Sequence, residues 1–234
     1  MKTAELDLWL TFWKPLSGVY RLRWLRLAVA GLHFQVDAVS FVHDHIFDST
    51  GLLLRKAIRR YTQDGQRALD LGTGHLGLLA IYCARTHNLR VIAVDVNEEF
   101  LENARIVAEA SNATGIEFRK SDWFSNLDGM FDVIFSNAPY VPTDVGALSH
   151  YSHYHPEIWD GGNDGLDCER VILNNAGHFL TPEGVLLMGI DTDFVPRAAT
   201  INLVQDTEDL ELKNIIKSWI SKSEVYVIGH RPHC

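Results

Sequence analysis

The sequence predicts an α/β fold built on a doubly wound, mostly parallel sheet that ends in a C-terminal antiparallel hairpin. From residue 67 onward, short apolar runs alternate with segments of helical periodicity, and parallel strands need such helical crossovers. A glycine-rich turn separates the first run from the first helical segment, and the last two runs follow each other with no helical segment between them. Together these observations predict a Rossmann-like fold.

The predicted strands are short and rich in Val, Ile, Leu and Phe, as is typical of strands buried on both faces. In chain order they cover residues 67–71, 90–96, 116–122, 131–137, 184–190, 210–216 and 223–230. Predicted helices lie between them at residues 74–86, 97–112 and 167–180. Asn97 is placed to cap the second helix, with Glu98 and Glu99 complementing the helix dipole in its first turn.

Two of the predicted connections between strands and helices have distinctive sequences. A turn over residues 182–184, which contains Pro182 and Gly184, is expected to precede the fifth strand. Residues 141–166 show no regular pattern, and connections of this length are usually functional loops.

The predicted domain organisation is a helical N-terminal extension over residues 1–35 followed by one α/β domain over residues 36–234. Leu6, Trp9 and Trp13 recur at helical spacing in the extension. The arginines that follow them fit either a solvated helix face or a basic surface for a partner or membrane.

The amino-acid composition is that of a globular protein and argues against several other classes. A hydrophobic content of 47% with 22% charged residues is typical of a globular domain. No apolar run is long enough to span a bilayer, and the acidic start lacks the pattern of a signal peptide, so we expect a cytoplasmic protein. A net charge of −9 argues against affinity based on neutralising nucleic-acid phosphates. The three cysteines form no CxxC pair, which favours neither a disulfide framework nor a zinc site.

The glycine-rich turn has the spacing GxGxxG at Gly72, Gly74 and Gly77, between a strand and a helix. Glycines there allow the backbone to turn tightly and approach a ligand whose polar groups meet the helix N-terminus. The next strand ends at Asp95, where a carboxylate can accept the hydroxyls of a ribose. The combination predicts an adenosine-bearing cofactor at the carboxyl ends of the strands.

Asp70 narrows the choice of cofactor. Its negative charge, two residues before the first glycine, would repel a pyrophosphate and suits a cationic ligand. S-adenosylmethionine is such a ligand, because it carries a sulfonium and an α-amine. Asp122 and Trp123, after the third strand, supply an acceptor and an aromatic face for adenine, although Trp123 equally suits the edge of the core.

The fourth strand ends in an unusual group of residues, Asn137, Ala138, Pro139 and Tyr140. Asn137 offers an acceptor and two donors, the fixed φ of proline makes the turn and its carbonyl rigid, and Tyr140 offers a flat face. This set fits a planar substrate group bearing an NH2, whose hydrogens would meet two acceptors while the ring packs on its plane.

These motifs resemble those of class I S-adenosylmethionine-dependent methyltransferases, and among them the protein N5-glutamine methyltransferases of the release-factor and ribosomal-protein type. The resemblance covers about residues 40–232 and rests on "DLGTGHLGLLA", "VIAVDVNEEFLENAR", "SDWF", "FDVIFSNAPYVPT" and the "HPEIWDGGNDGLD" block with the helix after it. That last block is more specific than the glycine motif and separates the subfamily from generic methyltransferases.

The resemblance implies methyl transfer to a planar amide or amine nitrogen, foremost the glutamine side chain of a protein substrate. It implies three catalytic residues: Asn137 and Pro139, whose oxygens hold the amide hydrogens, and Tyr140, which packs on the amide plane. Thr50 matches the family residue that leads into the cofactor site. The candidate cofactor-binding residues are Thr50, Asp70, Gly72, Gly74, Asp95, Val96, Asp122, Trp123 and Asn137. No metal is expected.

The sequence departs from the family at two points. Ala138 replaces the first proline of the usual Asn-Pro-Pro-Tyr turn, so the turn is expected to be less rigid. About 35 residues precede the family block, where the release-factor enzymes carry a larger helical domain that grips the protein substrate. The identity of the substrate is therefore open.

Other functions fit parts of the pattern. A nucleic-acid amino-methyltransferase of the N6-adenine type would use the same turn on a flipped base, and a small-molecule N-methyltransferase would use residues 141–165 as a lid. An NAD-dependent dehydrogenase shares the glycine motif but has no role for Asp70. A binding subunit that has lost catalysis is consistent with Ala138.

Histidines gather in two places, at His43 and His45 and at His150, His153 and His155. No accompanying spacing of a zinc site supports metal binding, and methyl transfer needs no metal, so we interpret them as solvated loop residues. His153 and His155 lie near the predicted substrate site, where contact with a substrate is conceivable.

Overall fold

The computed structural model describes residues 49–219 and 221–232 of the chain. The predicted extension over residues 1–35 and the histidines at positions 43 and 45 lie outside the described residues. No helix in the described ranges combines the length and the apolar character needed to cross a membrane.

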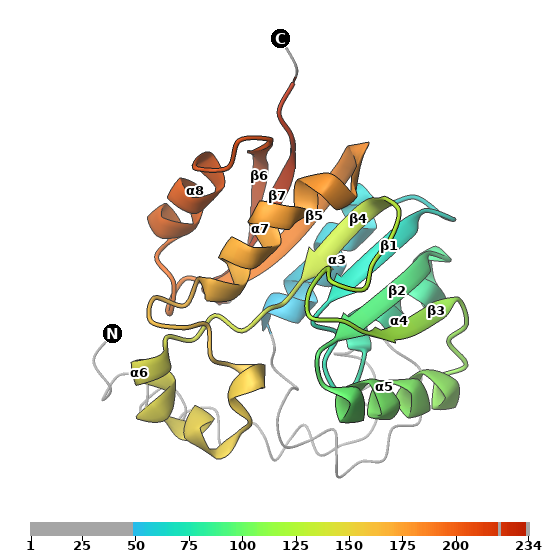
Figure 1. Cartoon of the computed structure of the whole chain (residues 1–234), viewed down its shortest axis with the longest axis horizontal. Helices are drawn as coiled ribbons and strands as arrows, with labels where there is room; N and C mark the ends of the chain where they lie inside the picture. The colour runs from blue at the N-terminus through green and yellow to red at the C-terminus, as the bar shows by residue number, and fades with distance from the viewer. Residues whose placement is uncertain (1–48, 220, 233–234) are drawn as a thin grey trace. The chain divides into compact units, whose positions relative to one another are not determined.

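Seven strands in the described part of the chain form one mixed sheet in the order β3-β2-β1-β4-β5-β7-β6 (Figure 1). They are β1 (Arg67–Leu71), β2 (Arg90–Asp95), β3 (Ile116–Lys120), β4 (Phe131–Ser136), β5 (Leu180–Asp191), β6 (Leu210–Lys217) and β7 (Ser223–His230). The first five pair in parallel, whereas β7 is antiparallel to both β5 and β6. The predicted doubly wound sheet with a C-terminal hairpin is confirmed.

Helices cover both faces of the sheet. They are α3 (Ser49–Tyr61), α4 (Leu78–His87), α5 (Glu98–Ala110), α6 (Thr143–Ala147), α7 (Asp167–Phe179) and α8 (Arg197–Gln205), with short 3-10 turns η1 (His150–His153) and η2 (Pro156–Ile158). α7 and α8 lie on one face, and α3 and α4 lie behind the sheet on the other (Figure 1). Asn97 caps α5 as predicted, because its side chain accepts the backbone N–H groups of Glu99 and Phe100.

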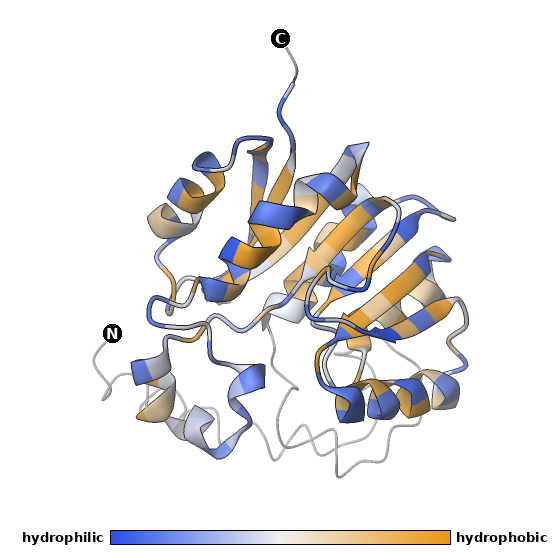
Figure 2. Cartoon of the chain, viewed as in Figure 1, coloured by the Kyte–Doolittle hydropathy of each residue, from blue (hydrophilic) through white to orange (hydrophobic). Residues whose placement is uncertain are grey.

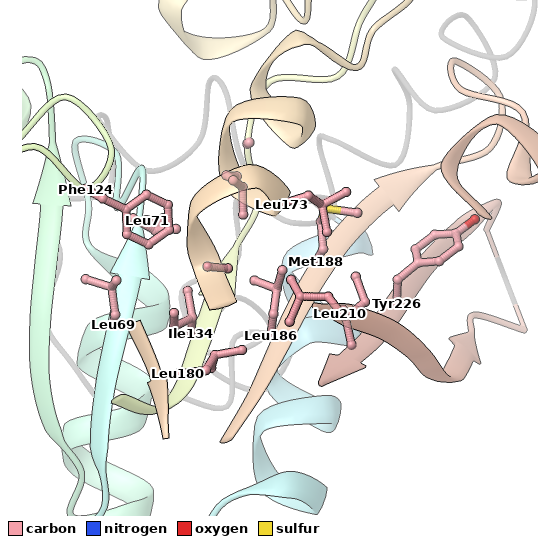
Figure 3. Close-up of a cluster of buried hydrophobic side chains, with 14 of the residues drawn as sticks. Leu69, Leu71, Phe124, Ile134, Leu173, Leu180, Leu186, Met188, Leu210 and Tyr226 are labelled. Atoms are coloured by element: carbon pink, nitrogen blue, oxygen red, sulfur yellow. The ribbon is translucent and has the colours of Figure 1, made fainter. Parts of the chain in front are cut away.

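The core has two layers because side chains alternate between the faces of a strand. Leu69, Ile134 and Leu186 lie on the face of the sheet that α7 covers and belong with Leu173 of α7 to one buried hydrophobic cluster (Figure 3). The alternate residues of the same strands pack against α3 and α4. In Figure 2 the strands are largely hydrophobic while the outward side of α7 is hydrophilic.

Several boundaries differ from the prediction. β5 begins at Leu180, paired with Phe131, and runs through the expected turn at residues 182–184. The pairing shifts register before it resumes at Val133 and Val185, so the extra residues are absorbed as an irregularity within the strand. The first predicted helix begins only at Leu78, because the glycine-rich turn occupies the residues before it.

The long connection after β4 is also more ordered than predicted. Instead of one irregular loop over residues 141–166, it contains α6, η1 and η2. Helices α3 and α8 were not predicted. α3 matters most for the site, because its second residue, Thr50, contacts Tyr140 in the turn after β4.

Candidate active site

The glycine-rich turn connects β1 to α4 and brings open backbone to the carboxyl end of the sheet. Gly72 and Gly74 have φ values of 72° and 67°, a conformation that L side chains rarely adopt. No atom lies within 4 Å of the position that a Cβ would take at either residue. The turn therefore leaves space beside its backbone at the place where a cofactor was predicted.

Asp95, the last residue of β2, fixes the geometry of this turn. Its Oδ2 accepts the backbone N–H of Gly74 at 2.9 Å, and its Oδ1 accepts the N–H of Asn97 at 3.0 Å. Burial raises the pKa of the Asp95 carboxyl, and the charge of Glu157 adds to the shift, although these backbone hydrogen bonds oppose it. The carboxylate thus joins two adjacent strand ends.

Glu157 was not predicted as a site residue. Its Oε2 accepts a hydrogen bond from Asn97 Nδ2 at 3.1 Å, which connects η2 to the end of β2. The two residues are 60 positions apart, so no local pattern in the sequence indicates this contact. It brings the segment after β4 next to the predicted cofactor-binding residues.

Asp70 lies within β1 and is only 1% exposed. Thr73 donates a hydrogen bond to its Oδ2 at 2.7 Å. Burial raises the pKa of Asp70 to about 7, and the charge of Asp95 contributes in the same direction. A buried acid with this pKa changes charge near neutral pH, so a nearby cation would favour its ionised form.

Asp122 and Trp123 follow β3, next to β2 in the sheet. Asp122 is exposed, whereas Trp123 is half-buried, has a φ of 49° and packs against the hydrophobic core. Val96, directly after β2, is 49% exposed. All three are at the correct end of the sheet, and their contacts with a cofactor remain predictions.

The end of β4 lies beside the end of β1. Ser136, the last residue of β4, donates a hydrogen bond to the Leu71 carbonyl at 2.9 Å. The Asn137 side-chain oxygen that follows is buried, and Ala138 is 3% exposed and belongs to the core. Because β1 separates β2 from β4 in a parallel arrangement, Asp95 and Asn137 both lie at the carboxyl edge of the sheet.

The block at residues 160–165 holds the turn after Asn137. Val141 donates its N–H to the Trp159 carbonyl, and Gly161 donates its N–H to the Val141 carbonyl, each at 2.9 Å. A Cβ at Gly161 would lie 2.8 Å from the carbonyl oxygen of Pro139 and from the Cα of Tyr140. Only glycine fits at this distance, so the subfamily-type block directly supports the predicted catalytic turn.

The carboxylates of this block maintain its own shape. Asp160 Oδ1 accepts hydrogen bonds from the Thr143 hydroxyl at 2.7 Å and from the N–H of Gly162 at 3.0 Å. Asp164 pairs with Arg170, which lowers the pKa of the Asp164 carboxyl. These acids organise the loop before α7.

Both the hydroxyl and the ring of Tyr140 contact other elements of the fold. Its hydroxyl lies 3.2 Å from Oγ1 of Thr50, and its ring centroid lies 6.0 Å from that of Phe194. Thr50 was predicted to lead into the cofactor site, and the structure places it against the predicted catalytic tyrosine. Phe194 was not predicted, since it lies in the connection after β5.

The histidine-rich segment forms η1 and the residues before η2, and His153 and His155 are exposed. Within residues 49–219 and 221–232, no group of three or more His, Cys, Asp or Glu side chains is arranged to hold a metal ion.

Comparison with known proteins identifies the family. A model of a methyltransferase domain matches residues 62–227, from just before β1 into β7. The chain belongs to this methyltransferase family. The match agrees with the predicted class I S-adenosylmethionine-dependent methyltransferase fold.

Curated relatives place the methyltransferase domain near the glutamine methyltransferases, as predicted. It is 41% identical over 162 residues to a ribosomal protein uL3 glutamine methyltransferase of Neisseria gonorrhoeae, covering 67% of this chain and 54% of that protein. It is 34% identical over 123 residues to a release factor glutamine methyltransferase of Francisella tularensis, covering 51% of this chain and 43% of that protein. The matches therefore span about half the length of these relatives.

Solved structures share the fold of the methyltransferase domain. A methyltransferase from Pyrococcus furiosus matches with a TM-score of 0.65 at 21% identity, covering 94% of this chain and 98% of that chain. A Thermus thermophilus 16S rRNA N2 G1207 methyltransferase in complex with AdoMet and guanosine matches with a TM-score of 0.57 at 19% identity, covering 82% and 45% respectively.

The family implies S-adenosylmethionine as cofactor, and the chemistry of the methyltransferase domain fits it. The turn at Gly72 and Gly74 leaves space beside open backbone, Asp95 presents a carboxylate at the position suited to a ribose, and Asp70 supplies negative charge toward a cationic group. The individual contacts remain predictions.

Proposed function

We propose that the domain transfers a methyl group from S-adenosylmethionine to the side-chain nitrogen of a glutamine in a protein substrate. The observation that carries the proposal is the close packing of Gly161 on Pro139 and Tyr140. It joins the block typical of the glutamine methyltransferases to the turn that would hold an amide. The relatives named for uL3 and release factors support the same substrate class.

When bound, S-adenosylmethionine supplies a methyl group activated by a positively charged sulfur. A carboxamide nitrogen is a weak nucleophile because its lone pair is delocalised, so the protein contributes mainly through positioning and electrostatics. In our proposal, Asn137 Oδ1 and the Pro139 carbonyl accept the two amide hydrogens. They thereby orient the nitrogen and stabilise the positive charge it gains.

Burial strengthens this arrangement. Hydrogen bonds to the Asn137 side-chain oxygen form away from bulk water, where they are electrostatically stronger. Tyr140 would pack on the amide plane, and the negative face of its ring would favour a group that becomes cationic. No strong base is required, since the nitrogen proton becomes acidic once the methyl group is attached.

The turn over residues 137–140 does not need a proline at position 138 for its rigidity. Ala138 is packed in the core, and the residues after it are tied to Trp159 and Gly161 by backbone hydrogen bonds. Packing therefore restricts the turn at position 138, where the family sequence uses its first proline, which favours a catalytic domain over a subunit that only binds.

Tyr140→Ala is expected to lower kcat for methyl transfer by about thirtyfold, because the variant loses both an aromatic packing contact and a hydroxyl hydrogen bond. Tyr140→Phe keeps the ring and should lose only about fivefold. Initial rates at saturating cofactor measure both effects. Equal losses for the two variants would show that the hydroxyl, and not the ring face, makes the contribution.

Cofactor affinity is expected to rise with pH through about 7. Asp70 has a pKa of about 7 in the free protein, and a cationic ligand favours its ionised form, so below that pH the carboxyl must lose a proton for tight binding. Dissociation constants from titration calorimetry at pH 6, 7 and 8, chosen to cover about one unit on each side, measure the trend. The Asp70→Asn variant should bind S-adenosylmethionine more weakly at every pH, and its affinity should lack the rise with pH that ionisation of Asp70 causes. A wild-type affinity that does not change over this range would contradict the prediction.

The acceptor is tested directly with purified uL3 and a purified release factor, each incubated with labelled S-adenosylmethionine. We expect label in one of them, and mass spectrometry of its peptides should place one added methyl group on a glutamine. The Asn137→Ala variant serves as the control and should incorporate label about 100- to 1000-fold more slowly. Label that enters only RNA, DNA or small molecules in a cell lysate would overturn the proposal and support the corresponding alternative.

A further inference from the structure

A chain of buried hydroxyl groups connects Tyr140 to the ends of two strands. The Tyr140 hydroxyl lies 3.2 Å from Thr50 Oγ1, Thr50 donates to Ser223 Oγ at 3.0 Å, and Ser223 donates to Asp191 Oδ2 at 3.5 Å. Thr50 and Ser223 are each 1% exposed. Asp191 ends β5 and pairs directly with Ser223, the first residue of β7, so the antiparallel register places these two groups together.

The direction of this chain follows from its last member. Ser223 donates its proton to Asp191 Oδ2, so the Ser223 oxygen accepts hydrogen bonds from Thr50 and from Ser49, whose Oγ lies 2.6 Å away. The Thr50 proton is directed at Ser223, which leaves Thr50 Oγ1 to accept the proton of Tyr140. The Tyr140 phenol is then a donor at the start of a series that ends at the Asp191 carboxyl group, and hydrogen bonds in such a series polarise one another.

The sequence of β5 makes room for this contact. A Cβ at Gly189 would lie 2.5 Å from Cγ2 of Thr50, so the first turn of α3 can approach β5 this closely only over a glycine. Thr50 is therefore held in place by packing as well as by its hydrogen bonds. Phe194, whose ring centroid lies 6.0 Å from that of Tyr140, restricts the ring from another element.

We propose that Thr50, Ser223 and Asp191 act as positioning residues that fix the plane of the Tyr140 ring and increase its electron density. An electron-rich ring face stabilises positive charge better than a neutral phenol that donates to water. The group that benefits is the amide nitrogen as it gains the methyl group, so this inference rests on the proposed function. It assigns a role to two hydroxyl residues and a carboxylate that the catalytic turn itself does not contain.

We call the hydrogen-bonded series from Tyr140 through Thr50 and Ser223 to Asp191 the relay. A double-mutant cycle on kcat tests it, using wild type, Ser223→Ala, Tyr140→Phe and the double variant. Ser223→Ala is expected to lower kcat about fivefold, with KM for the protein acceptor and the affinity for S-adenosylmethionine unchanged. In the Tyr140→Phe background the same change should have no further effect, because the relay acts through the hydroxyl already removed. Equal losses in both backgrounds, or no loss in either, would overturn the relay.

Two further variants separate positioning from general destabilisation. Gly189→Ala keeps every polar group but displaces Thr50, so it should reproduce the kcat loss of Ser223→Ala. Thr86→Val removes an exposed hydroxyl at the end of α4 and should leave kcat unchanged. A wild-type kcat in Gly189→Ala, or the fivefold loss in Thr86→Val, would argue against the relay.

The same four proteins of the cycle are also compared by denaturant unfolding, which needs no acceptor. If the relay exists, the shifts in free energy of unfolding caused by Ser223→Ala and Tyr140→Phe are not additive. Wild-type protein that methylates no glutamine would refute the proposed function while this second cycle still decides the relay. Active wild-type protein with additive effects in both cycles would refute the relay alone.

Discussion

Asn137→Ala is expected to lower the rate of methyl transfer by about 100- to 1000-fold, the usual loss when one preorganised polar group is removed from a developing charge. Asn137 follows the last residue of β4, its side-chain oxygen is buried, and the turn after it is packed between the core and the block at residues 160–165. An acceptor held in this way costs little reorganisation during the reaction. Its loss should therefore appear in kcat.

The measurement combines single-turnover rates with calorimetric binding of S-adenosylmethionine. Although Asn137 is itself a candidate cofactor-binding residue, cofactor affinity should change little, because the turn at Gly74 and the Asp95 carboxylate lie on the far side of β1 from β4. Asn174→Ala, an exposed asparagine on α7, serves as the matched control and should keep the wild-type rate. Turnover retained in Asn137→Ala would remove this residue from the mechanism.

Local patterns made the central sheet and its functional edge predictable. The strands are short apolar runs, the Asn97 cap has a direct chemical signature, and parallel strands necessarily place Asp95 and Asn137 at one edge. The predicted start of β5 at residue 184 was wrong. Proline and glycine at residues 182–184 indicate a turn, whereas pairing with β4 absorbs them within the strand, which begins at Leu180. Tertiary pairing overrode the local signal.

The supporting contacts of the site were not predictable in the same way. Thr50 and Ser223 are 173 positions apart, and only the meeting of α3 with the start of β7 brings their hydroxyls together. Ser and Thr residues carry no pattern that separates a buried relay from an ordinary loop. The contact between Asn97 and Glu157 depends in the same way on how the segment after β4 folds back. Such contacts require the three-dimensional arrangement, and they account for how the predicted catalytic residues are held.

Asp95→Ala is expected to weaken binding of S-adenosylmethionine by about 1.5–3 kcal/mol, the contribution of hydrogen bonds to a charged group. The carboxylate accepts the N–H groups of Gly74 and Asn97, so its removal also frees the turn that the cofactor would contact. Asp95→Asn keeps an acceptor of the same shape and should lose less affinity. Calorimetry on both variants, with Asp206→Ala as an exposed control for the loss of one charge, measures the effect. An unchanged dissociation constant in Asp95→Ala would exclude the ribose contact, because a charged acceptor at the end of β2 cannot be removed without cost if the sugar hydroxyls depend on it.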